Sequence, residues 1–515
     1  MPGGNSELQK HFCFYTFDTH IFKEEKNRMK MKKFFALVLA AVMGLSVTAC
    51  KPSESSSAGV GSTAASSQAQ QEIVNLKWVM VGNGMPKNYD AWKANINKYL
   101  GEKIGVNIDV EVVAWGDWQS RRSVIVSTAG DYDILFTDMG TYASDVRLNA
   151  FADISETVQK AAPDLYKYIP ADYWNACKIG GKLYAAPTYK DSSATQYFVW
   201  DKAMVDKYSL KVDTLKTLDS LTDSLTKIKQ GEGTAPFILA SDGLGAVTSW
   251  YDRMGTGMPS IGVRYDDANR KVVAVFEQQD VMNDLKTLNK WYKAGIINQD
   301  AATLAEAPKY RACFVAQGWS SAAKTTWGPN MGKDAVAYQW GDTVASNDTV
   351  QGSLNCISSN CKNPDKALAF LQLVNLDTKV RDAFYYGLEG DNFTYTADKK
   401  IHRNNTDWSM AGYTQGTFFN VTQLDDTDFN QWDEVKTLNE NAKASVLLGF
   451  TFDPTNYADQ IANCTAIFER YKGELLTGTA DPETTVAAMM KEMRAAGFDD
   501  IVKAAQAQID KQYSK

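Results

Sequence analysis

The stretch IVNLKWVMVGNGMPKNYDAWKANINKYLGEKIGVNIDVEV, at residues 73–112, decides the fold of this chain. Its first part, residues 73–81, is a mainly apolar run typical of a buried strand, and a Gly-Asn-Gly turn follows it. Residues 89–104 carry aromatic and aliphatic side chains at helical spacing, and residues 106–112 alternate apolar and polar side chains. The stretch therefore predicts a strand, a helix and a second strand.

The same order continues downstream. A polar helix is expected over residues 117–129 and a third strand over 132–136. Strands that alternate with helices form a parallel sheet with right-handed crossovers, and ligands of such sheets bind beyond the carboxyl ends of the strands. We therefore expect an α/β fold in which the loops at 82–85, 115–118 and 138–142 share one rim.

A lipoprotein signal precedes the folded part. Lysines within residues 30–33 lead into an apolar run of 14 residues at 34–47, and the motif VTAC ends at Cys50. This run is shorter than the roughly 20 residues of a membrane span. We expect residues 1–28 to be an upstream extension and Cys50 to become the lipidated N-terminus after cleavage. The alternative is an ordinary secretory signal in which the cysteine has no role.

Composition limits the possible partners. Residues 51–71 are rich in Ser, Ala, Gly and Gln, so they predict a flexible linker that reaches on the order of 25 Å. Without residues 1–49 the chain has 47 basic and 57 acidic side chains, a net charge of −10. Nucleic acid is therefore not an expected partner, and membrane contact is expected only through the lipid.

Histidine and cysteine usage argues against several site types. His402 is the one histidine after Cys50, so neither histidine-based catalysis nor a multi-histidine metal site is expected, and no cofactor is predicted. Cys356 and Cys361 are close enough in sequence for a local disulfide, with free thiols as the alternative.

Seven motifs resemble one known family in order along the chain. They are YDILFTD at 132–138, GGKLYAAPTYK at 180–190, WYKAGIINQDAAT at 291–303, CKNPDKALAFL at 361–371, YGLEGDNF at 386–393, ASVLLGFTFDP at 444–454 and AAGFDDIVKAAQAQID at 495–510. In these motifs the chain resembles the extracellular solute-binding lipoproteins of ABC importers. The resemblance is to the Firmicutes branch of that family, which has a characteristic C-terminal domain.

The resemblance implies a type II fold of two α/β lobes, joined by crossing strands, that close on a ligand. Crossings would fall near 186–190, near 352–357 and soon after Gly390. The implied parts are leader 1–49, linker 50–71, first lobe 72–187 with 352–392, second lobe 188–351, and a helical C-terminal region 393–515 packed on the lobes. The chain departs from the family at Asp391, where a basic residue or histidine is usual.

Candidate ligand-binding residues follow from the rim loops and from the resemblance. Trp319 ends the strand-like segment 312–319, where related sugar-binding proteins place an aromatic ring in the cleft. Tryptophan faces stack on sugar rings, although each tryptophan could instead belong to the core. The full set is Asn83, Trp115, Asp138, Tyr142, Tyr189, Lys190, Trp319 and Trp327.

Acidic clusters are interpreted as exposed loops. Glu389 and Asp391 could form a paired-carboxylate site, but nothing else in the sequence supports acid–base catalysis. The aspartates within 425–428 lack the glycine turn and terminal glutamate of an EF-hand, so no metal site is predicted.

These observations favour a monomeric, lipid-anchored receptor at the extracellular face of the membrane. It would capture a solute, expected to be a carbohydrate or oligosaccharide, and pass it to the transmembrane subunits of an ABC permease without acting as an enzyme. A peptide-binding receptor of the same fold and a surface-anchored glycoside hydrolase are the alternatives. An adhesion or structural lipoprotein is a third interpretation, and it predicts no cleft that closes.

Overall fold

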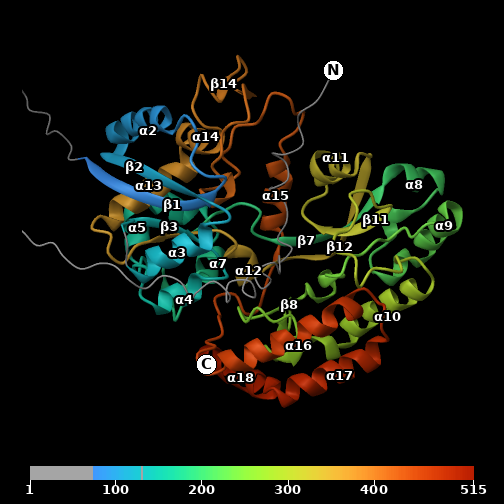
Figure 1. Cartoon of the computed structure of the whole chain (residues 1–515). Helices are drawn as coiled ribbons and strands as arrows, with labels where there is room; N and C mark the ends of the chain where they lie inside the picture. Colours follow the sequence, from blue (N-terminus) through green and yellow to red (C-terminus); the bar gives the residue numbers. More distant parts are fainter. Residues whose placement is uncertain (1–72, 129–130, 515) are drawn as a thin grey trace, which may run out of the picture. The chain divides into compact units, whose positions relative to one another are not determined.

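The computed structural model describes residues 73–128 and 131–514, which form two groups of strands and helices (Figure 1). The predicted leader, Cys50 and the linker lie outside these residues. Within the described ranges, every helix is too short or too polar to cross a membrane.

The first lobe is built on a five-stranded sheet in the order β2-β1-β3-β13-β6. Its strands are β1 (Val74–Gly82), β2 (Val106–Ala114), β3 (Ile134–Thr137), β13 (Leu354–Ile357) and β6 (Ala185–Pro187). As predicted, β1 pairs in parallel with β2 and β3. In contrast, β13 runs antiparallel to β3 and β6, because it enters the sheet from the second lobe and not through a crossover helix. The sheet is therefore mixed.

Helices pack on both faces of this sheet around an aromatic core. Trp78 of β1 contacts Phe370 edge to face, with ring centroids 5.7 Å apart, and both side chains are fully buried. The helices of this lobe are α2 (Tyr89–Ile104), α3 (Trp118–Ser127), α4 (Tyr142–Arg147), α5 (Thr157–Ala161), α6 (Pro163–Tyr168), α7 (Ala171–Ala176), α13 (Pro364–Leu376) and α14 (Thr378–Tyr386). Two hairpins complete it, β4 (Lys178–Ile179) with β5 (Lys182–Leu183) and β14 (Phe393–Tyr395) with β15 (Ile401–Arg403).

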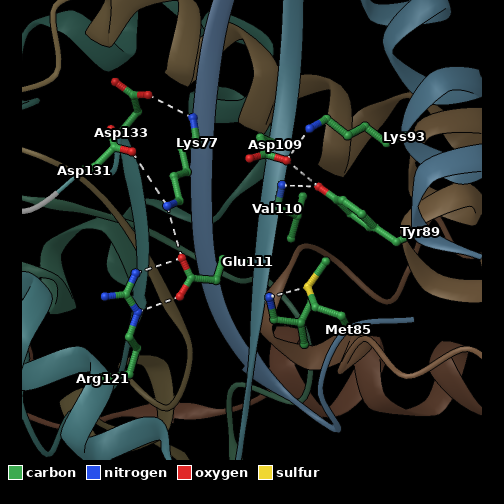
Figure 2. A network of polar contacts seen from close by, with 11 residues as sticks. Lys77, Met85, Tyr89, Lys93, Asp109, Val110, Glu111, Arg121, Asp131 and Asp133 are labelled. Carbon is green, nitrogen blue, oxygen red and sulfur yellow. Dashed lines mark hydrogen bonds and ion pairs between the residues drawn. The ribbon is translucent and has the colours of Figure 1, made fainter. Parts of the chain in front are cut away.

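Polar contacts connect α2 and α3 to the edge strand β2 (Figure 2). Both nitrogens of the Arg121 fork donate to the Glu111 carboxylate, at 2.6 and 2.9 Å. On the other side of β2, the Tyr89 hydroxyl donates to Asp109 at 2.8 Å and accepts the backbone N–H of Val110 at 2.6 Å. These contacts fix the positions of the loops that leave β1 and β2.

The second lobe is built on a four-stranded sheet in the order β11-β7-β12-β16 and a smaller sheet in the order β10-β9-β8. The strands are β7 (Ala194–Asp201), β8 (Tyr251–Asp252), β9 (Ile261–Arg264), β10 (Val273–Ala274), β11 (Cys313–Gln317), β12 (Ala335–Ala345) and β16 (Lys443–Ala444). The helices are α8 (Lys202–Lys207), α9 (Thr222–Glu232), α10 (Gln279–Lys293) and α11 (Gly328–Met331). Helix α12 (Asn347–Val350) lies at the second passage, where Val350 joins the core of the first lobe. Short helical turns are η3 (Val212–Thr214), η4 (Asp219–Leu221), η5 (Gly245–Thr248), η6 (Val275–Glu277) and η7 (Ala323–Trp327), with η8 (Gly412–Thr414) in the first lobe.

The C-terminal helices share the core of the second lobe. Phe468 stacks on Phe276 with ring centroids 5.5 Å apart, and the Asn289 side chain donates to the carbonyls of Gly478 and Ala480. These helices are α16 (Ala458–Leu476), α17 (Pro482–Ala495) and α18 (Phe498–Tyr513), and α15 (Gln431–Glu440) precedes them. The last three helices are therefore an integral part of this lobe.

The chain passes between the two sheets three times. The first two passages join β6 to β7 and β12 to β13, near the expected positions. The third differs from the expectation that it follows soon after Gly390. Trp408 and Met410 still belong to the core of the first lobe, and the chain enters the second sheet only at β16. The passage therefore lies within residues 420–443, which include α15.

All five cysteines of the described residues are free thiols, including Cys356 and Cys361. Cys356 is fully buried in β13, where burial raises the thiol pKa well above its usual value. The local disulfide that the spacing allowed is therefore absent from the structure.

Candidate functional site

Asn83 and Trp115 lie side by side on the rim of the first lobe. They directly follow Gly82 and Ala114, which are register partners at the carboxyl ends of β1 and β2. The indole Nε1–H of Trp115 donates to the Asn83 side-chain oxygen at 3.0 Å, and 43% of Trp115 is exposed. The prediction that these two loops share a rim is thus confirmed by the geometry of parallel strands.

Tyr413 joins this rim from a distant part of the chain. The Ser409 hydroxyl donates to the carbonyl of Gly84 at 2.8 Å, and the Asn83 backbone N–H donates to the carbonyl of Ser409 at 3.1 Å. The adjoining segment places the Tyr413 ring parallel to Trp115, with centroids 6.1 Å apart and planes 12° apart. Two flat aromatic rings therefore form a stacked platform at the carboxyl edge of the sheet.

Lys190 lies near the Tyr413 ring. Its ammonium stands 5.9 Å from the centre of the Tyr413 ring and 2.5 Å from a carboxylate oxygen of Asp191. Lys190 is buried, and it belongs to the first passage between the lobes. We call Asn83, Trp115, Asp138, Lys190 and Tyr413 the rim site. Tyr413 has no signal in the sequence, because the surrounding MAGYTQG segment matches no motif.

Buried Arg381 holds the segment that carries Tyr413. Its guanidinium donates to the carbonyl of Thr417 at 2.7 Å, to the Gln415 side-chain oxygen at 2.9 Å and to the carbonyl of Gly412 at 3.0 Å. Burial lowers the pKa of Arg381 to about 10, so the group stays protonated at neutral pH. The platform is therefore attached to the rigid core of the first lobe.

Asp138 follows β3 on the same rim. Its carboxylate accepts the backbone N–H of Gly140 at 2.9 Å. Burial raises the pKa of Asp138, while this hydrogen bond and the positive charge of Arg122 oppose the rise. The residue stabilises the turn and is partly exposed.

Two predicted rim residues lie in the core instead. Tyr142 is completely buried at the start of α4, where its hydroxyl donates to the carbonyl of Cys177 at 2.5 Å. Tyr189 is 3% exposed and packs edge to face against Tyr173 and Phe419. Packing therefore covers both side chains, and their contact with a ligand stays a prediction.

The other two predicted tryptophans are covered in this structure. Trp319 is 4% exposed and contacts Trp432 of α15 at a centroid distance of 5.8 Å. Trp327 is 3% exposed and packs against Tyr197 at 5.9 Å. The contact of either ring with a ligand stays a prediction.

The acidic loops have local partners. Asp391 accepts a hydrogen bond from the Asn88 side chain at 2.7 Å, and Asp425 lies 2.8 Å from Nδ1 of His402. Across residues 73–128 and 131–514, the structure contains no group of three or more His, Cys, Asp or Glu side chains that could hold a metal ion.

Two protein families match this chain. Residues 94–388 match the bacterial extracellular solute-binding proteins, and residues 446–514 match a domain of unknown function (DUF3502). The first match covers more than half of the sequence. The chain belongs to the bacterial extracellular solute-binding protein family.

The chain is also similar to proteins named for carbohydrate transport. A carbohydrate ABC transporter substrate-binding protein of Streptococcus pneumoniae is 26% identical over 451 residues, which cover 84% of this chain and 90% of that protein. The crystal structure of an N-glycan transport solute-binding protein from the same species has a TM-score of 0.74 and 25% identity, over 86% of this chain and 100% of that one.

Two further structures share the fold. The same pneumococcal protein has been solved in complex with Man1GlcNAc, with a TM-score of 0.64, 25% identity, and coverage of 85% of this chain and 99% of that one. A solute-binding protein for human milk oligosaccharides from Bifidobacterium longum infantis has a TM-score of 0.62 over 86% of this chain and 100% of that one. It is 17% identical, so it supports the two-lobed fold alone.

Proposed function

We propose that this protein captures an oligosaccharide outside the cell and delivers it to an ABC importer. The observation that carries the proposal is the exposed Trp115 ring, which is stacked on Tyr413 and oriented by Asn83. Flat aromatic faces bind the C–H faces of sugar rings, and neighbouring amide and carboxylate groups bind hydroxyls. Asn83 and Asp138 supply such groups on the same rim.

The comparisons support this ligand class. The relatives that cover most of the chain are named for carbohydrate or N-glycan transport, and they are binding proteins and not enzymes. We therefore propose binding without hydrolysis, transfer to transmembrane permease subunits, and a monomeric state. A lipid on Cys50 would keep the receptor at the outer face of the membrane.

Substitution of Trp115 tests the proposal. Titration calorimetry would compare Man1GlcNAc, larger mannose-containing glycans and short peptides with the intact protein. We expect a glycan to bind and Trp115→Ala to weaken its binding by roughly thirtyfold, about 2 kcal/mol, because the stacking surface is lost.

Tyr310→Ala is the matched control. Tyr310 is a similarly exposed aromatic residue (39%), and it precedes β11, whereas Trp319 follows the same strand. It should leave the affinity unchanged. Binding of peptides but not glycans would favour the peptide receptor, and release of free sugar during the titration would favour a hydrolase. Wild-type affinity in a folded Trp115→Ala protein would remove the platform from the site.

A further inference from the structure

The Glu434 carboxylate of helix α15 is hydrogen-bonded to the second lobe. One oxygen of Glu434 accepts the backbone N–H of Ser320 at 2.7 Å and its hydroxyl at 2.5 Å. The other oxygen accepts the backbone N–H of Ser321 at 2.9 Å and its hydroxyl at 2.6 Å. We call these four hydrogen bonds the Glu434 clasp. Hydrogen bonds to an ionised group are among the strongest in proteins, so the clasp fixes α15 on the turn that follows β11.

The same helix contacts the first lobe through Trp432. Its ring lies 4.3 Å from the Phe418 ring, which in turn packs against Tyr385 of α14. The adjacent Thr417 is bonded through its carbonyl to Arg381, so Phe418 belongs to the rigid part of the first lobe. Trp432 therefore stands between Phe418 of one lobe and Trp319 of the other.

The far end of α15 meets the first passage between the lobes. The Asn439 side chain donates to the carbonyl of Lys190 and accepts from the Ser193 hydroxyl at 2.8 Å. The helix thus extends from the passage between β6 and β7 to the contact of Trp432 with both lobes, and Figure 1 draws it between α14 and α11. The two lobes cannot separate near Trp319 unless the Glu434 clasp or the Trp432 packing is broken.

Trp319 itself indicates a second state. Its indole Nε1–H is buried and has no hydrogen-bond partner among the described residues. A buried donor without an acceptor is unfavourable, so a state that supplies an acceptor to this N–H is stabilised by it. Sugar hydroxyls can act as such acceptors, and Trp432 packs against the Trp319 ring at a tilted angle.

We propose that α15 is a strap that holds the two lobes of the ligand-free protein together over Trp319, and that an arriving glycan displaces its Trp432 end. The displacement step rests on the proposed function, whereas the strap itself does not. In this mechanism part of the binding free energy is used to open the strap, so weakening the strap strengthens glycan binding.

Glu434→Gln tests both steps, because the amide keeps the shape but its NH₂ group cannot accept the hydrogen bonds of one serine. Without ligand, small-angle scattering should show a larger radius of gyration than wild type. With Man1GlcNAc, calorimetry should show about tenfold tighter binding, since the competing contact is weaker. Asp433→Asn, an exposed change one position away on the same helix, is the matched control and should match wild type in both experiments.

Ser320→Ala with Ser321→Ala gives a second variant that removes two bonds of the clasp from the opposite side. This variant should also increase the radius of gyration without ligand and tighten glycan binding. It provides the test if Glu434→Gln does not fold. Scattering identical to wild type in the folded variants would overturn the strap. Unchanged or weaker glycan affinity would overturn the displacement. If the wild-type protein binds no glycan, the proposed function is wrong. The scattering comparison without ligand still tests whether α15 holds the lobes together.

Discussion

At the residue scale, Asp284 of α10 is a partly buried carboxyl group. Burial, with the negative charge of Asp280 one turn away, raises the pKa of Asp284 to about 7. Because the folded state holds this proton more tightly than the unfolded chain, the protein loses stability as the pH rises from about 4 to about 7. We expect Asp284→Asn to raise the melting temperature at about pH 8 and to change it little at about pH 4.

Melting curves across this pH range, read by circular dichroism, provide the measurement. The exposed Asp398→Asn serves as the control and should give parallel curves. A stability difference for Asp284→Asn that does not depend on pH would contradict the assignment of the raised pKa to this carboxyl group.

At the element scale, the loop between β16 and α16 attaches the C-terminal helices to the passage between the lobes. The Gly449 backbone N–H donates to the Asn347 side chain of α12 at 2.8 Å, and the Gln512 side chain of α18 donates to the carbonyl of Gly449 at 3.1 Å. Gly449 has a φ of +84°, and a Cβ atom there would lie 2.9 Å from the carbonyl oxygen of Asn175. The domain of unknown function therefore begins at the junction of both lobes.

Gly449→Ala should lower the free energy of unfolding by about 2 kcal/mol or more, because it combines a left-handed backbone with a steric clash. Urea titration measures the loss. Gly257→Ala is the matched control, since Gly257 has a φ of +73° but open space around the added atom. Equal losses in the two variants would show that the close approach to Asn175 is unimportant.

At the scale of the whole molecule, we expect the receptor to remain on the cell through a lipid on Cys50, which lies outside the described residues. Cys50→Ala should move the protein from the membrane fraction into the medium or leave its leader uncleaved, because no acyl chain can then be attached. Fractionation and mass spectrometry of the N-terminus provide the measurement. Cys361→Ala, which changes a partly exposed thiol, should stay in the membrane fraction. An acylated, membrane-bound Cys50→Ala protein would refute the anchor.

The sequence alone determined the elements whose signals are local. The period of apolar residues predicted β1, α2 and β2, and the structure confirms each of them. The carboxyl ends of β1 and β2 lie next to each other because the two strands are parallel neighbours. The sequence therefore predicted that the loops of Asn83 and Trp115 share a rim, and the two side chains are hydrogen-bonded there.

Only the tertiary structure decided which side chains complete that rim. Tyr413 reaches Trp115 through contacts such as Ser409 with Gly84, whose residues are 325 positions apart, and no local pattern encodes such a pairing. Tyr142 and Trp319 have the same residue types as good ligand-binding side chains, but the free energy of packing buried them. Side-chain exposure depends on every element that packs nearby, so it is a property of the assembled fold and not of a segment.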